Sequence, residues 1–301
     1  MFTKLKQKIP IKYFMVVYLG GLLVFSSVAL GEWERLWRGI FIVLLYAVFD
    51  LLWTYVRDKT WYLPVSSMIS GLILSLVAIP EPPFRFIILL PFVAVFSKQI
   101  LRLGKPRHIF NPASFSMAII AFFVPSVSWW GVAWGRISSD MLASILFVIT
   151  LAVGIMILWR QNRWHVALPF LLSYAVLLAL LFWWNGVVLA RLIGVVSPLI
   201  LDGTVLFFAT VMLIEPITSS FPYLRDRVWY GVSVGFFAVL MTYLSGVVSW
   251  ANIDPLIFGL LLGNLVASLL FLPQRRARAA ISAAPRQSAS PKSAAIYNPS
   301  F

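Results

Sequence analysis

Residues 164–184 read WHVALPFLLSYAVLLALLFWW, a run that contains no Asp, Glu, Lys or Arg. A helix needs about 20 predominantly apolar residues to cross the hydrocarbon core of a bilayer, and this run is long enough. The whole chain has the same character, because 61% of its 301 residues are hydrophobic and only 11% are charged. A soluble domain is nearer half apolar and a quarter charged. The sequence therefore predicts an all-α polytopic membrane protein.

Ten segments of the chain are apolar over a length that crosses a membrane or nearly does so. They are residues 11–30, 37–56, 61–80, 84–103, 109–127, 140–159, 164–184, 200–221, 228–249 and 253–272. The apolar stretch 186–199 contains Arg191 and Pro198, and we interpret it as an interfacial or re-entrant piece before the eighth span. The prediction is therefore about ten transmembrane helices.

The basic residues support this count. With a cytoplasmic N-terminus, each predicted inner loop carries at least two Lys or Arg and each outer loop at most two, as the positive-inside rule requires. An even number of spans then places both termini in the cytoplasm of a multi-pass protein of the cytoplasmic membrane. The net charge of +14 is explained by loops that face anionic lipid, so no nucleic acid is expected. The alternative for the N-terminus, a signal peptide cleaved near Ala29, would leave an odd span count.

Ten spans divide into two halves of five, and an odd number of spans per half makes the halves inverted in the membrane. The chain then consists of a short basic N-terminus (1–10), a first five-helix repeat (11–127), an outer loop (128–139), a second five-helix repeat (140–272) and a disordered basic tail (273–301).

The fifth and tenth spans begin alike. One opens Asn111-Pro112-Ala113-Ser114-Phe115 and the other Asp254-Pro255-Leu256-Ile257-Phe258. Pro is favourable in the first turn of a helix, and Asn or Asp before it can cap free backbone N–H groups. Both are either ordinary capped helices at the interface or half-helices whose positive ends face a central cavity. In the second case we expect Asn111, Glu215 and Asp254 to line that cavity.

Charged side chains inside a membrane are costly and mark functional or paired positions. Asp50 and Lys98 lie in the inner thirds of their spans and are expected to form an ion pair. Glu215 precedes a proline that frees backbone carbonyls, and carboxylate plus carbonyl oxygens is an arrangement that handles sodium or protons. Asp202 and Asp254 are either helix caps or part of the same path. The candidate ion path is thus Glu215, Asp202, Asp254, Asp50 and Lys98.

Several chemistries are excluded by residue type. The chain has no Cys, so it offers no Cys-ligated zinc and no iron–sulfur cluster. Its two histidines, His108 and His165, are placed near the inner face at helix starts, whereas haem ligands would lie deep in paired spans. We therefore expect no haem, and we assign no catalytic and no metal-binding residue.

Two motifs resemble a known family of membrane subunits. The first runs Ile109-Phe110-Asn111-Pro112-Ala113, after Gly71-Leu72-Ile73-Leu74 in the third span, and the second runs from Phe207 to Ser219 with Glu215-Pro216-Ile217-Thr218-Ser219 at its end. Over roughly residues 60–272 the chain resembles the family that contains the B subunit of sodium-translocating NADH:quinone reductase and the D subunit of the Rnf electron-transport complex.

The resemblance implies ten helices in inverted repeats, similar to urea transporters, and flavin-linked electron transfer coupled to Na⁺ or H⁺ movement. In that family an FMN is esterified to a Thr in a Ser/Thr-Gly-Ala-Thr motif after the fifth span. The corresponding loop here, Pro125 to Asp140, contains no Thr. Covalent FMN is therefore not expected, and non-covalent FMN or riboflavin is the cofactor that remains, with Asn111, Pro112 and Thr218 as its expected contacts.

The sequence accordingly favours an integral membrane subunit of an electron-transport system, with a flavoprotein reductase or other electron-transport subunits as partners. Two alternatives stay open. One is a channel or transporter on the same fold without redox chemistry, which the missing Thr favours. The other is a subunit that docks a reductase through the basic inner face and the tail 273–301.

Overall fold

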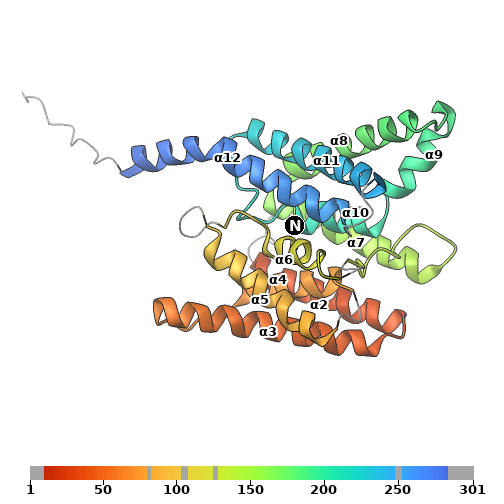
Figure 1. The fold of residues 1–301 in the computed structure, drawn as a ribbon. Helices are drawn as coiled ribbons and strands as arrows, with labels where there is room; N and C mark the ends of the chain where they lie inside the picture. Colours follow the sequence, from red (N-terminus) through yellow and green to blue (C-terminus); the bar gives the residue numbers. More distant parts are fainter. Residues whose placement is uncertain (1–9, 80–82, 103–107, 125–127, 248–252, 284–301) are drawn as a thin grey trace, which may run out of the picture.

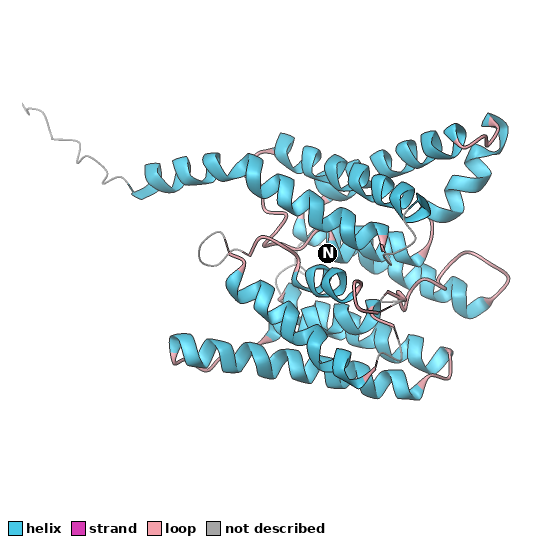
Figure 2. Cartoon of the chain, in the orientation of Figure 1, coloured by secondary structure: helices cyan, strands magenta, loops and turns pink. Residues whose placement is uncertain are grey.

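The computed structural model describes residues 10–79, 83–102, 108–124, 128–247 and 253–283, with side chains described as far as residue 270. In these ranges the chain is helical and contains no strand, only two isolated β-bridges (Figure 2). The prediction of an all-α protein is confirmed for this part of the chain.

The described helices follow one another closely along the chain. They are α2 (Ile11–Ala29), α3 (Trp33–Asp58), α4 (Val65–Val77), α5 (Phe84–Ile100), α6 (Pro112–Ile120), α7 (Met141–Gln161), α8 (Trp164–Trp184), α9 (Leu189–Ile200), α10 (Gly203–Phe207), the π-helix η1 (Phe208–Met212), α11 (Leu224–Val247) and α12 (Pro255–Ala283).

Five of these helices are long and apolar enough to cross a membrane, namely α2, α3, α7, α8 and α11. Helix α9 and the continuous α10–η1 segment together pass the same test but meet at an angle of 56°. The described residues thus contain five candidate spans, or six if the bent pair is one span. This supports a multi-pass helical membrane protein.

Three predicted spans are clearly shorter in the structure than in the sequence analysis, and one of them is the third, expected over 61–80, which is the 13-residue helix α4. The fifth, expected over 109–127, is the nine-residue helix α6, and the eighth, expected over 200–221, ends as a helix at Met212. Proline lacks a backbone N–H and disfavours helical geometry in the preceding residue. Both helices accordingly end a few residues before a proline, Pro125 and Pro216 respectively.

The end of the chain also differs from expectation. The sequence predicts a disordered tail from residue 273, but α12 continues to Ala283. Residues 273–283 are rich in Ala and Arg, which are strong helix formers, and this explains the extension. Residues 284–301 of the predicted tail and residues 1–9 of the predicted basic N-terminus lie outside the described residues.

The helices form two groups that meet at α6 and α12. In the first half (α2–α6), α4 packs against α2 and α3, and α5 packs against α3 and α6. In the second half (α7–α12), α10 packs against α7, and α11 packs against α8 and α12. Helices α6 and α12 contact each other, and Figure 1 shows most red-to-yellow helices on one side of this contact and most green-to-blue helices on the other.

Candidate functional site

A cavity of about 380 Å³ lies where the two halves meet. We call it the inner cavity, because it adjoins Lys12 and Gln161 at the end of the molecule that the sequence predicts to be cytoplasmic. The described residues lining it are Ile11, Lys12, Met15, Ser66, Ile69, Ser70, Ile73, Lys98, His108, Asn111, Pro112, Ala113, Gln161, Val211, Glu215, Pro216 and Ile217. Its walls are mostly apolar, with a small set of polar groups from both halves.

The N-terminus of α6 opens onto this cavity. Asn111 caps the helix, because its Oδ1 accepts a hydrogen bond of 3.1 Å from the backbone N–H of Ser114. Its Nδ2 points across the interface to the carbonyl oxygen of Met212, at 3.5 Å, at the end of η1. The cap predicted from the sequence is confirmed, and the positive end of the short helix α6 faces the cavity.

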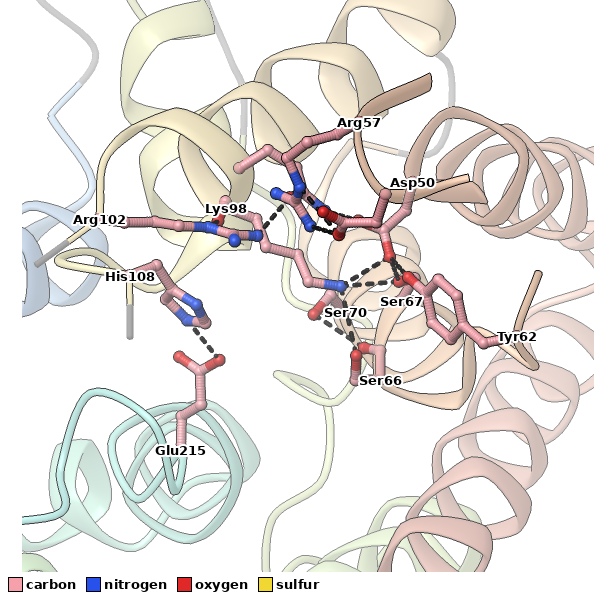
Figure 3. A network of polar contacts seen from close by, with 12 residues as sticks. Asp50, Arg57, Tyr62, Ser66, Ser67, Ser70, Lys98, Arg102, His108 and Glu215 are labelled. Atoms are coloured by element: carbon pink, nitrogen blue, oxygen red, sulfur yellow. Dashed lines mark hydrogen bonds and ion pairs between the residues drawn. The ribbon is translucent and has the colours of Figure 1, made fainter. Parts of the chain in front are cut away.

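Glu215 lies on the opposite wall, in the non-helical segment after η1. Its Oε1 is 3.0 Å from Nε2 of His108, which precedes α6 in the first half (Figure 3). Thr218 donates a hydrogen bond to the second carboxylate oxygen at 3.3 Å. Both side chains are largely buried, with 3% of His108 and 19% of Glu215 exposed. Two titratable groups, one from each half, therefore meet at the edge of the cavity.

Lys98 and Asp50 form the ion pair that the sequence predicts, with 2.9 Å between Nζ and Oδ2. Asp50 is fully buried. Its carboxylate also accepts hydrogen bonds from Ser67 Oγ and Gln99 Nε2, both at 2.5 Å, and from the Tyr62 hydroxyl (Figure 3). Each Asp50 oxygen is therefore satisfied by neighbouring donors, and it is the ammonium of Lys98 that reaches the cavity lining.

The network continues toward the inner end of the molecule. Gln99 Oε1 accepts a hydrogen bond of 2.7 Å from Arg57 and another from Arg102. A tyrosine hydroxyl is protonated at neutral pH, so Tyr62 remains a donor to Asp50.

The other candidate residues lie elsewhere. Asp202 caps α10 by accepting a hydrogen bond of 2.8 Å from the backbone N–H of Val205. Asp254 caps α12 through the N–H groups of Leu256 and Ile257, both at 3.0 Å. Neither aspartate is among the described residues that line the inner cavity. The expectation that Asp254 shares this cavity with Asn111 and Glu215 is wrong, because the first turn of α12 lies near the C-terminal end of α6, where Phe258 contacts Phe122, whereas Asn111 caps the N-terminus of α6.

In addition to Asn111, two residues were expected to contact the cofactor, and they lie in different places. Pro112 lines the inner cavity, whereas Thr218 is not among its described lining residues and bonds instead to Glu215. His108 was not predicted as a site residue. Its partner is 107 positions away, and no local pattern of the sequence links the two. Within the described ranges, no three His, Asp or Glu side chains gather in a way that could hold a metal ion.

Comparison with other proteins gives one informative similarity. No model of a known protein family matches the chain. The chain is 28% identical over 233 residues to the D subunit of the ion-translocating oxidoreductase complex of Methanosarcina acetivorans, and the match covers 67% of this chain and 68% of that protein. The similarity is distant, and it supports no more than a relationship to the family of that D subunit. The D subunit is one of the two proteins whose motifs this chain resembles.

Proposed function

We propose that this chain is a membrane subunit of an ion-translocating electron-transport complex, a distant relative of the D subunit of such complexes. The observation that carries the proposal is the similarity over 233 residues to a protein of that description. Because that relative is a subunit of a complex, other electron-transport subunits are the proposed partners. The helices of membrane-spanning length place the chain within the bilayer.

We propose further that the two halves are inverted five-helix repeats. Support comes from the matching neighbours of the helices: α2 packs on α4 as α7 packs on α10, and α3 packs on α5 as α8 packs on α11. The pair α5 and α6 likewise corresponds to α11 and α12. In this proposal α4, α5, α6, α10–η1 and α12 are the remaining five membrane segments, and α9 is an addition to the second half.

The proposed cofactor is FMN or riboflavin, held without a covalent bond in the inner cavity. A volume of about 380 Å³ lies within the range of about 300–1,000 Å³ typical of small-molecule sites. Ile69, Ile73 and Val211 supply apolar walls, and Asn111 and Gln161 supply amide groups that can donate hydrogen bonds. A bound flavin would supply one- and two-electron transfer there.

The chain's own side chains have defined roles in this proposal. The His108–Glu215 pair can exchange a proton with a group held in the cavity, because both are titratable and lie at its edge. Glu215 also presents a carboxylate beside a non-helical backbone, the kind of arrangement that holds Na⁺ or handles H⁺ in transporters. We assign ion coupling to Glu215 and not to Asp50, because Glu215 lines the cavity and is 19% exposed, whereas Asp50 is fully buried and is not among the described lining residues.

The flavin is tested by blocking its site. Purified protein is expected to show visible flavin absorbance that is lost to the supernatant on acid precipitation. Ile69→Trp places a larger ring in the cavity lining and is expected to abolish the absorbance. Leu52→Trp, at a half-exposed position on the outer surface of α3, is the matched control and should retain it.

Absence of flavin from the purified protein, and again after incubation with FMN and with riboflavin, would overturn the cofactor proposal. An ion flux in liposomes that follows a gradient but ignores a reductant would instead select a transporter without redox chemistry. Co-purification of a flavoprotein reductase that requires residues 284–301 would select a docking subunit.

A further inference from the structure

Part of the loop that follows α6, residues 128–135, packs inside the protein. Only 6% of Trp130 and 1% of Val132 are exposed. The backbone N–H groups of Trp129 and Gly131 donate to the carbonyl oxygens of Val77 and Leu76, at 2.7 and 2.6 Å, at the end of α4. Trp130 adopts a φ of +54°, which non-glycine residues rarely adopt. The loop is thus fixed to the first half in an unfavourable conformation that its contacts must compensate.

The same loop is also fixed to the second half. Trp130 Nε1 donates a hydrogen bond of 2.7 Å to Asp254 Oδ2, and its ring contacts Phe207 and Phe208 edge to face. Further along, the carbonyl oxygen of Gly135 accepts a hydrogen bond of 2.8 Å from the N–H of Gly203. The segment 128–135 therefore links the end of α4 to the starts of α10 and α12.

Arg35 adds a third attachment. Its guanidinium carbon lies 3.1 Å from the centre of the Trp129 ring, and its side chain is 98% buried while paired with Glu32 at 3.1 Å. A cation is attracted to the face of an aromatic ring, and the attraction is strongest where water is excluded. The start of α3 thus covers the loop from the side.

These contacts lie at the opposite end of the interface from the inner cavity. The cavity reaches Ile73 and Val211. Beyond them the described side chains are packed without exposure, with Leu74, Phe207 and Phe208 at 0%. The loop 128–135 covers this packed layer on its far side.

We propose that residues 128–135 are a plug that seals the outer end of the interface between the halves, with the Trp130–Asp254 hydrogen bond as its latch. The plug occupies the loop on which the family resemblance would place a covalent flavin. The loop contains no Thr, its backbone is bonded to α4 and α10, and Trp130 fills the space between the halves. A covalent flavin does not fit here. The plug leaves the inner cavity open to one side of the membrane alone.

The test uses the absence of Cys from the chain, because a single introduced Cys is then the only thiol. Val132→Cys reports on the buried plug, and Ile137→Cys, at a position 75% exposed, reports on the loop surface. Both are treated in sealed vesicles with a membrane-impermeant maleimide on the side that labels Ile137→Cys. Burial should slow the labelling of Val132→Cys at least about tenfold relative to Ile137→Cys.

The latch is tested by two changes that leave other contacts in place. Trp130→Phe keeps an aromatic ring but removes the donor, and Asp254→Ser keeps a good helix-capping residue but is too short to reach the indole. Each is expected to speed the labelling of Val132→Cys by about tenfold, since the lost hydrogen bond involves a charged group. Trp184→Phe, at a position 84% exposed, is the control and should change nothing.

Asn162→Cys, at an exposed position between α7 and α8, verifies folding and insertion in the same backgrounds, since it should be labelled from the opposite side alone at an unchanged rate. If one latch variant fails this check, the other carries the comparison. Labelling of Val132→Cys as fast as Ile137→Cys in the otherwise unchanged chain would overturn the plug, and latch variants without effect would overturn the latch. None of these readouts depends on a flavin or on electron transfer, so the plug and the proposed function fail separately.

Discussion

Asp50 shows how one buried charge is tolerated. Four side chains donate to its carboxylate, namely Tyr62, Ser67, Lys98 and Gln99. Removing one partner of a buried ion pair leaves the other charge uncompensated, which costs about 3–5 kcal/mol. The two partners are not equal here, because Asp50 keeps three donors without Lys98, whereas Lys98 without Asp50 keeps only neutral hydroxyls within its described network.

We therefore predict that Asp50→Asn destabilises the protein more than Lys98→Met. The double variant should be more stable than the sum of the two losses implies, since contacting residues couple. Thermal unfolding in detergent measures all three. Glu34→Gln, which breaks the more exposed Arg38–Glu34 pair, is the control and should have little effect, as is usual for surface pairs. Equal losses for the two single variants would contradict the asymmetry.

The residue scale also shows what the sequence could predict. Asp50 and Lys98 were predictable as partners, because they are isolated charges of opposite sign and both lie in the inner thirds of their predicted spans. Asn111 and Asp254 were predictable as caps from the Asn/Asp-Pro pattern. The His108–Glu215 and Trp130–Asp254 contacts were not predictable, since each joins residues more than 100 positions apart. The local sequence singles out only one member of each pair, Glu215 and Asp254, and gives no sign of its partner.

At the scale of elements, close helix packing depends on glycine. A Cβ on Gly259 of α12 would lie 2.7 Å from the backbone N and 2.8 Å from Cα of Ala238 in α11. Backbone atoms cannot rotate away as a side chain can, so the two helices would have to separate. Gly246 of α11 has no atom within 4 Å of its Cβ position in the described part of the chain.

We predict opposite outcomes for the same substitution at these two sites. Gly259→Ala should lower the thermal stability, because the α11–α12 contact would be forced apart. Gly246→Ala should leave it unchanged or raise it by about 0.8–1 kcal/mol, the difference in helix propensity between Gly and Ala. Unfolding temperatures in the same detergent compare the two. A loss at Gly246 as large as that at Gly259 would mean that packing is not the cause.

Element lengths were less predictable than element existence. Hydropathy located every described helix, but it could not show that α6 has nine residues or that α10 continues as a π-helix. Apolar composition continues past both helix ends, and what ends them is the backbone geometry near proline and the contacts of the other half. The same limit applies to α12, whose polar extension to Ala283 follows helix propensity and not hydropathy.

At the scale of the whole molecule, the open question is whether the bent pair α9 and α10–η1 crosses the membrane. The sides of the membrane on which the neighbouring loops lie give the answer. If the pair is one broken span, the loops on either side of it face opposite solvents. Asn185, between α8 and α9, should then share a side with Ile137, and Tyr223, after η1, should share a side with Asn162. This alternation also places α6 and α12 with opposite directions, as inverted halves require.

We predict that single Cys substitutions of these four residues fall into two groups when sealed vesicles are treated with a membrane-impermeant maleimide. Ile137→Cys and Asn185→Cys should react from one side, and Asn162→Cys and Tyr223→Cys from the other. The positive-inside rule assigns the second pair to the cytoplasm, because Arg160, Arg163, Arg225 and Arg227 flank those two sites. Labelling of Tyr223→Cys from the same side as Asn185→Cys would show that the bent pair returns to its own side. The halves would then differ in span number, and an inverted repeat could not hold.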